Sequence, residues 1–292
     1  MAAVLQDASN TSSAPIGVFD SGVGGLSVLR HIHALLPHEA LLYFADTAYS
    51  PYGEKSESVL TARALAIGAF LVEQGAKAIV VACNTATVAA IAALRAAYPA
   101  MPIVGVEPGL KPGAAASRNG KVAVLATEAA LAAAKFQLLH QQLSASSQAQ
   151  FILRGCPGLA DQIELGELDS DDLNTMLRRY VLPLLDQGAD TLVLGCTHYP
   201  LVRHAIERIV AEAGAGHVVL VDTGDAVARQ LGRLLAAGGL LAPATAAAGH
   251  VAVRGYTSAS AAKLQAAFHA LLGLTVPVES VSVGAPMAAL TP

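Results

Sequence analysis

Short aliphatic runs alternate with longer segments of helical periodicity along the chain. Most of the short runs lack polar alternation, which is typical of strands buried on both faces of a mostly parallel sheet. The longer segments place apolar residues at helical spacing. We predict strands at Ile16–Phe19, Leu41–Phe44, Ala78–Ala82, Pro102–Val106, Lys121–Leu125, Phe151–Leu153, Thr191–Gly195, His217–Val221 and His250–Val253, and helices at segments such as Leu60–Gln74, Ala86–Ala97, Asp171–Leu185 and Leu201–Ala213.

An internal repeat links two distant parts of the chain. The sequence EQGAKAIVVACNT at 73–85 aligns without a gap with DQGADTLVLGCTH at 186–198. Each copy indicates a helix end, a turn at the glycine, a buried strand and a cysteine at the carboxyl end of that strand. A single cysteine in this position is more often a small buried hydrophobe. Two cysteines at matching positions of a repeat, each followed by polar residues, favour a functional role.

The repeat and the alternating pattern together predict a layered α/β protein with two lobes. The stretch Glu107–Gly113, rich in glycine and proline, is the best candidate for a crossing between them. We expect a discontinuous lobe of residues 16–107 and 221–292 and a second lobe of residues 108–220. Residues 1–15 lack the basic start and apolar run of a secretory signal and are expected to form a disordered tail.

Ligands bind at the carboxyl ends of strands in open α/β sheets, so two such lobes could place Cys83 and Cys196 on opposite walls of one cleft. Facing thiols suit the inversion of a carbon centre: one thiolate removes a proton and the other thiol returns a proton to the opposite face. A free cysteine pKa near ~8.5 already gives a minor thiolate fraction at neutral pH. Asp20 and His198 are candidates to relay these protons. Glu164 is a third candidate, which spacing alone does not identify.

The loop Asp20–Gly25 (DSGVGG) favours a small zwitterionic ligand, because backbone N–H groups at a helix start suit a carboxylate. Its match to a dinucleotide-binding loop is weak, since Ser27 stands at the third glycine position, and no Walker lysine follows for ATP. Cys83, Cys196 and His198 could be drawn as zinc ligands, but the chain has no C-x-x-C and no paired-histidine helix, which argues against a metal. Cys156 has no counterpart in the repeat and is expected to be structural.

Composition narrows the class of protein. Hydrophobic residues make up 54% and charged residues 14% of the chain, which excludes a disordered protein. The mean hydropathy of +0.51 reflects alanine, and the longest uncharged stretch, Leu234–Val253, lacks the dense aliphatic run of a membrane span. A net charge of −4 and a pI near 6.1 argue against nucleic acid as a ligand. Three widely spaced cysteines argue against a disulfide framework and favour free thiols in a reducing cytoplasm.

Five blocks, in order along the chain, resemble the motifs of bacterial glutamate racemases, which belong to the aspartate/glutamate racemase superfamily. The resemblance runs from about residue 16 to the C-terminus. It implies two pseudo-symmetric three-layer α/β lobes with mostly parallel sheets and an active site in the cleft between them. It also implies cofactor-independent interconversion of L- and D-glutamate. The blocks are GVFDSGVGGLSVL (17–29), FADTAYSPYGEKS (44–56), VACNTAT (81–87), VGVEPGLKPG (104–113) and LGCTHYPLV (194–202).

The resemblance assigns roles to individual residues. It implies that Cys83 takes the proton from D-glutamate and Cys196 the proton from L-glutamate, with Asp20 and His198 as proton relays. Glu164 matches an acid of the family that follows a Cys-Pro pair. The substrate-binding positions that the resemblance implies are Asp20, Ser21, Pro51, Tyr52, Gly53, Asn84, Thr85, Thr197 and His198.

One departure from the family pattern concerns the segment after the strand at Lys121–Leu125. Thr127 is kept, but the Gly-Thr pair that usually follows is Ala129-Ala130 here. A hydroxyl that helps to hold the substrate is therefore missing or replaced. We expect turnover to survive, because both thiols and their relays are present.

The expected partners are small: glutamate as substrate, a second copy of the chain in a homodimer, and neither membrane nor nucleic acid. No cofactor is expected, and the resemblance implies a cytoplasmic enzyme that supplies D-glutamate for peptidoglycan and so for the cell wall and cell shape. Two alternatives stay open. One is a racemase of aspartate or another amino acid. The other is a binding or inhibitory protein on the same fold, as reported for members that act on DNA gyrase.

Overall fold

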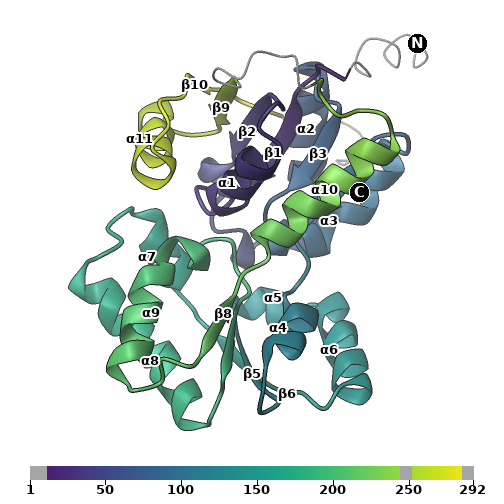
Figure 1. Cartoon of the computed structure of the whole chain (residues 1–292). Coiled ribbons are helices and arrows are strands. Elements are labelled where there is room, and N and C mark those ends of the chain that lie inside the picture. Colours follow the sequence, from purple (N-terminus) through teal and green to yellow (C-terminus); the bar gives the residue numbers. More distant parts are fainter. Residues whose placement is uncertain (1–11, 244–251, 285–292) are drawn as a thin grey trace. The chain divides into compact units, whose positions relative to one another are not determined.

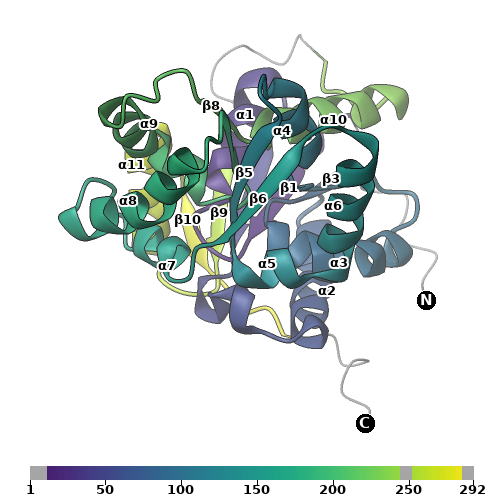
Figure 2. The ribbon, with the colours of Figure 1, turned by 90° about the horizontal axis from the view of Figure 1, so that it is seen from below.

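The computed structural model describes residues 12–243 and 252–284, and the chain divides into two compact units (Figures 1 and 2). Unit 1 extends to Val106 and resumes at Gly224, and unit 2 is Glu107–Thr223. Of the predicted tail at 1–15, residues 1–11 lie outside the described residues. Within its remainder, the carbonyl of Pro15 accepts a hydrogen bond from the backbone N–H of Lys77 at 2.9 Å.

Unit 1 contains a six-stranded sheet in the order β10-β9-β2-β1-β3-β4, and every pairing is parallel. Helices α1 and α10 pack against each other, and helices α2 and α3 do likewise. The strands are β1 (Ile16–Asp20), β2 (Leu41–Ala45), β3 (Ala78–Val81), β4 (Ile103–Gly105), β9 (Val253–Thr257) and β10 (Val278–Ser280); the helices are α1 (Leu26–Leu35), α2 (Glu57–Glu73), α3 (Asn84–Ala97), α10 (Gly224–Ala237) and α11 (Ala261–Leu272), with short 3-10 turns η1 (Thr47–Tyr49) and η2 (Tyr52–Glu54).

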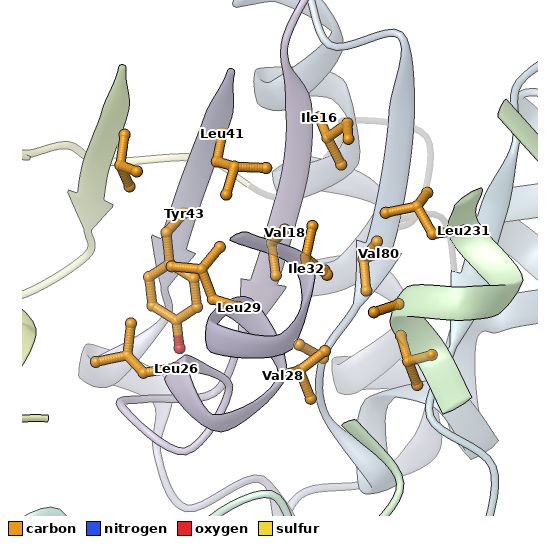
Figure 3. Close-up of a cluster of buried hydrophobic side chains, with 14 of the residues drawn as sticks. Ile16, Val18, Leu26, Val28, Leu29, Ile32, Leu41, Tyr43, Val80 and Leu231 are labelled. Carbon is orange, nitrogen blue, oxygen red and sulfur yellow. The ribbon is translucent and has the colours of Figure 1, made fainter. Parts of the chain in front are cut away.

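Both faces of this sheet are covered, which explains why its strands read as uninterrupted aliphatic runs. Ile16 and Val18 of β1 belong to one cluster with residues of α1 and α10 (Figure 3). Helix α11 also contributes to this cluster. Phe19, which points to the opposite face, belongs to a second cluster with α2 and α3. Gly17 leaves room for Leu71 of α2, because a Cβ at this position would lie 3.0 Å from the Leu71 Cδ1. Strand β1 is therefore buried at the centre of the unit.

Unit 2 contains a four-stranded parallel sheet in the order β6-β5-β7-β8. Helices α7, α8 and α9 gather on one face and α4 and α6 on the other (Figures 1 and 2). The strands are β5 (Lys121–Ala126), β6 (Gln150–Gly155), β7 (Thr191–Leu194) and β8 (Val219–Val221); the helices are α4 (Leu110–Ala116), α5 (Glu128–Ala132), α6 (Ala134–Ser146), α7 (Leu159–Glu164), α8 (Asp171–Asp186) and α9 (Arg203–Glu212), with a 3-10 turn η3 (Tyr199–Val202).

The internal repeat corresponds to the same structural unit in both places. Helix α2 ends before Gly75 and helix α8 before Gly188, and these glycines have φ of 84° and 83°. Left-handed glycines commonly end helices, because they carry no Cβ that would clash in this conformation. Each glycine leads into a buried strand, β3 or β7, and each strand ends just before a cysteine, Cys83 or Cys196. The predicted order of helix, turn, strand and thiol is confirmed.

The α/β class and the parallel sheets are confirmed, and two strand assignments need correction. The strand predicted at His250–Val253 is β9, which begins only at Val253; residues 250–251 lie outside the described residues. Strand β10 was not predicted, because it has three residues, Val278–Ser280, of which Glu279 and Ser280 are exposed. Such a short edge strand has no hydrophobic run to reveal it.

Candidate active site

Cys83 and Asp20 come together because they follow neighbouring parallel strands. Strands β1 and β3 pair in register, and the backbone N–H of Ala82 donates a hydrogen bond to the carbonyl of Phe19 at 2.8 Å. Asp20 ends β1, and Cys83 lies two residues after the end of β3 and directly precedes α3. Both side chains therefore reach the same edge of the unit 1 sheet, where Asp20 is fully buried and Cys83 is only 6% exposed.

A hydroxyl lies between this thiol and this carboxylate. The Cys83 Sγ donates to the Ser21 Oγ at 3.9 Å, and the Ser21 Oγ donates to the Asp20 Oδ1 at 3.5 Å. The other carboxylate oxygen of Asp20 accepts from the backbone N–H of Gly25 at 2.6 Å. Only glycine fits there, since a Cβ at Gly25 would lie 2.6 Å from the Asp20 Cβ. We call Asp20, Ser21 and Cys83 the first cysteine site.

Tyr52 belongs to the surroundings of the first cysteine site. Its hydroxyl donates to the Asp46 Oδ2 at 2.6 Å, and Asp46 is in turn paired with Arg63 at 2.7 Å. Burial, followed by the charge of Asp46, the hydrogen bond to Asp46 and then the charge of Cys83, raises the pKa of Tyr52 well above its usual range. Tyr52 is therefore a neutral hydrogen-bond donor at physiological pH. The Ser50–Pro51 peptide bond that precedes it is cis.

Cys196 follows β7 in unit 2 and forms a second arrangement of different chemistry. The Cys196 Sγ lies 3.7 Å from the Nδ1 of His198, and the Nε2 of His198 lies 2.7 Å from the Oε2 of Glu164. A carboxylate only accepts, so a neutral imidazole carries its proton on Nε2 and offers Nδ1 as acceptor to the thiol. The side chains of His198 and Glu164 are 6% and 18% exposed. We call Glu164, Cys196 and His198 the second cysteine site.

The backbone just before Cys196 packs closely against strand β5. Gly195 donates its N–H to the carbonyl of Leu125 at 2.7 Å, and a Cβ on Gly195 would lie 2.8 Å from the same oxygen. Glycine is thus needed for β7 to pass β5 and present the thiol at the strand end. Thr197 is buried beside Cys196.

The structure places every predicted site residue within one of the two units. It brings Asp20, Ser21 and Cys83 together in unit 1, and Glu164, Cys196 and His198 together in unit 2. The other predicted substrate-binding residues lie in the loops and helix starts that follow β2, β3 and β7, where Tyr52, Asn84 and Thr197 are buried, Pro51 and Thr85 half-buried and Gly53 exposed.

Two supporting features were not predicted. Asp46 and Arg63 hold Tyr52 in place, but nothing in their spacing connects them before the fold is known. Gly25 binds Asp20 through its backbone, and the only sequence signal for this contact is the glycine-rich loop itself.

The segment that departs from the family pattern forms the start of helix α5. The Oγ1 of Thr127 accepts a hydrogen bond from the backbone N–H of Ala130 at 3.2 Å and so caps the start of α5. Ala130 is 7% exposed. The hydroxyl of Thr127 is therefore already engaged with the helix start.

Cys156 is buried away from solvent and is held as a thiol. Its Sγ donates to the carbonyl oxygen of Arg154 at 3.5 Å. Burial raises the pKa of Cys156 to about 12, and this rise is only partly offset by the hydrogen bond with Tyr199 and the charge of Arg154, which lower the pKa. A thiol that stays protonated is neither a nucleophile nor a base at neutral pH.

This pKa predicts a loss of stability in alkali. Below the pKa of the unfolded thiol, ~8.5, the Cys156 thiol is protonated in both the folded and the unfolded protein. Between this pKa and about pH 12, the thiol loses its proton in the unfolded protein and keeps it in the folded protein. The free energy of unfolding should fall by about 2 kcal/mol between pH 7 and pH 10 on account of Cys156 alone. Urea unfolding at both pH values should show a steeper fall for the native chain than for Cys156→Ala. Equal falls would contradict the buried protonated thiol.

Within residues 12–243 and 252–284 there is no group of three or more His, Cys, Asp or Glu side chains that could hold a metal ion. In the same part of the chain, no helix has both the length and the apolar character needed to cross a membrane.

Comparison with known proteins places these features in a family. The Asp/Glu/Hydantoin racemase family model matches residues 16–231. A curated glutamate racemase of Pseudomonas aeruginosa is 53% identical over 235 residues, which cover 80% of this chain and 86% of the relative.

Solved structures agree. A glutamate racemase of Escherichia coli, in complex with L-glutamate and the activator UDP-MurNAc-ala, has a TM-score of 0.79 and 32% identity and covers 93% of this chain and 99% of its own. A glutamate racemase of Francisella tularensis in complex with D-glutamate has a TM-score of 0.78 and 28% identity, with 93% and 98% covered. The chain therefore belongs to the Asp/Glu/hydantoin racemase family and, within it, to the glutamate racemases.

Proposed function

We propose that the protein interconverts L- and D-glutamate without a cofactor, and that Cys83 and Cys196 are its two acid–base groups. In this mechanism the Cys83 thiolate removes the α-proton of D-glutamate, and the Cys196 thiol donates its proton to the opposite face of the same carbon. The products are L-glutamate, a Cys83 thiol and a Cys196 thiolate. The reverse reaction starts from this last state, so each turnover leaves the enzyme ready for the opposite enantiomer.

The observation that carries the proposal is that each thiol has its own proton relay. Ser21 links Cys83 to the carboxylate of Asp20. His198 links Cys196 to the carboxylate of Glu164. A thiol with an adjacent base can lose its proton near neutral pH, and a thiol that has gained a proton can be reset through the same groups.

The substrate has two carboxylates and one ammonium group, and the loops around both thiols supply matching donors and acceptors. We propose that backbone N–H groups and short side chains at the ends of β1, β2, β3 and β7 bind these groups. The residues concerned are Asp20, Ser21, Pro51, Tyr52, Gly53, Asn84, Thr85, Thr197 and His198. The neutral hydroxyl of Tyr52 is held by Asp46 and helps to fix this loop.

A role in the cell follows from the reaction. We propose that the enzyme works in the cytoplasm, as a homodimer, and supplies D-glutamate for peptidoglycan and hence for the cell wall and cell shape. The glutamate racemases of E. coli and F. tularensis, solved with L- and D-glutamate, support the choice of substrate.

The circular dichroism of D-glutamate, incubated with the reduced protein and no added cofactor, tests the activity. We expect the signal to decay to zero as the racemic mixture forms, while a parallel sample of D-aspartate stays constant. Decay with aspartate alone would assign the chain to aspartate. Constant signals for both amino acids, with folded and reduced protein, would contradict racemase activity and favour a binding protein on this fold.

A further inference from the structure

Helix α7 carries Glu164 but is too short to hold its own position. It has six residues, Leu159–Glu164, and follows Gly158, which has φ of 75°. Among the described residues no side chain caps its start. Leu159 and Ile163 are buried in the unit 2 core, which fixes one face of the helix. Isolated helices of this length are unstable in water, so the position of Glu164 depends on what holds the turn before α7.

Tyr180 of α8 holds that turn. Its hydroxyl donates a hydrogen bond to the carbonyl oxygen of Pro157 at 2.7 Å, and Pro157 directly precedes Gly158. The residue is 6% exposed, and its ring packs in the same core cluster as Leu159. Burial raises the pKa of Tyr180, so the phenol remains a donor throughout the physiological range.

We propose that Tyr180 is a positioning residue for the second cysteine site. Its hydroxyl fixes the start of α7, so that Glu164 at the end of this helix stays 2.7 Å from His198 and keeps the imidazole beside Cys196. The proposal rests on the proposed racemase function for its kinetic consequences. It extends the acid–base machinery to a hydroxyl on α8 that touches neither thiol.

The hydroxyl and the ring of Tyr180 have separable effects. The ring fills core volume, which phenylalanine would fill equally well. Only the hydroxyl binds Pro157. Tyr180→Phe therefore removes the hydrogen bond and keeps the packing. If the role of Tyr180 were purely structural, this substitution would lower the stability of the protein and leave kcat almost unchanged. Tyr256→Phe is the matched control, since the hydroxyl of Tyr256 donates to the Oε1 of Gln74 in unit 1 at 3.3 Å.

A double-mutant cycle with Glu164→Gln tests whether Tyr180 acts through Glu164. Tyr180→Phe should lower kcat about tenfold at unchanged KM, since small displacements of catalytic groups cost this much or more. In the Glu164→Gln background the same substitution should lower kcat by less than about twofold. Tyr256→Phe should change kcat by less than about twofold in both backgrounds. An equal fall from Tyr180→Phe in both backgrounds, or no fall at all, would overturn the proposal.

Kinetic isotope effects distinguish a specific defect at the second cysteine site from a general loss of activity. When only Cys196 is impaired, removal of the α-proton from L-glutamate becomes slower, whereas removal from D-glutamate becomes a rapid pre-equilibrium. With α-deuterated substrates, Tyr180→Phe should therefore raise the isotope effect for L-glutamate and lower it for D-glutamate. Parallel changes in both directions would indicate a merely structural residue.

A measurement that needs no turnover tests the positioning role of Tyr180 separately from the proposed racemase activity. The Nε2 proton of His198, bound to Glu164, should give a downfield NMR signal in the native chain that is lost in Glu164→Gln. This signal should broaden in Tyr180→Phe and stay sharp in Tyr256→Phe. If the native chain fails to racemise glutamate but the signal responds in this way, positioning by Tyr180 stands while the proposed function fails. An unchanged signal in Tyr180→Phe would overturn the positioning role.

Discussion

Replacement of Cys196 by serine should lower kcat for both enantiomers of glutamate by about 10³-fold or more, a loss at the upper end of what acid–base groups contribute. A serine hydroxyl is a far weaker acid than a thiol and supplies almost no alkoxide near pH 7. His198 and Glu164 would still be present, but the group that exchanges the proton with the substrate would not. Cys83→Ser should have an effect of similar size, because each direction of the reaction needs one thiol as base and the other as acid.

Cys156→Ala is the matched control for these two variants. Cys156 is a buried thiol as well, but it is held protonated, and among the residues that the structure describes it has no relay of the kind found at the other two cysteines. Racemisation followed by circular dichroism should fall less than about tenfold in Cys156→Ala and by three orders of magnitude in the other two. Activity that survives Cys196→Ser would contradict a two-thiol mechanism.

Lys77→Met should lower the free energy of unfolding by about 3–5 kcal/mol, because it leaves a buried carboxylate without its counter-charge. The Nζ of Lys77 lies 2.5 Å from the Oε2 of Glu39, and these side chains are 0% and 2% exposed. The same Nζ donates to the carbonyl oxygen of Ser12, and the Oε1 of Glu39 accepts from the backbone N–H of Ala242. The ion pair and these two hydrogen bonds thus join four segments of unit 1 that are distant in the sequence.

The double variant Lys77→Met/Glu39→Gln provides the control. Its glutamine keeps an oxygen for the N–H of Ala242 and carries no charge. We expect it to be more stable in urea unfolding at pH 7 than Lys77→Met, since no charge is left buried. If the double variant is no more stable than the single one, loss of packing rather than an unpaired charge explains the effect.

Much of the fold could be predicted from hydrophobic patterning, for a definite reason. Strands such as β1 and β3 are covered on both faces, so every residue from Ile16 to Phe19 is apolar or glycine and the run is conspicuous. The internal repeat further predicted that Cys83 and Cys196 each lie at the end of a buried strand. It could do so because both units have the same order of helix, left-handed glycine, strand and cysteine. Strand β10 lacks this signal, since two of its three residues are exposed.

Only some of the proton-relay residues could be predicted from patterns in the sequence. Asp20 and His198 lie close in sequence to strand ends that the pattern identifies. Glu164 is 34 residues from His198, at the end of a short helix, and no spacing rule connects them. Only the family resemblance pointed to this acid, and the distance of 2.7 Å between the two side chains depends on the packing of α7.

The division of unit 1 between two chain segments has a consequence for biosynthesis. Strand β2 pairs with β9, which is Val253–Thr257, so one edge of β2 stays open until the ribosome has released that late segment. Unit 2, Glu107–Thr223, is continuous and emerges earlier, so its sheet can close while unit 1 is still incomplete. During that interval the apolar edge at Leu41–Ala45 is available to pair with other chains. We therefore expect nascent chains that stall before β9 to depend on chaperones and to aggregate through β2.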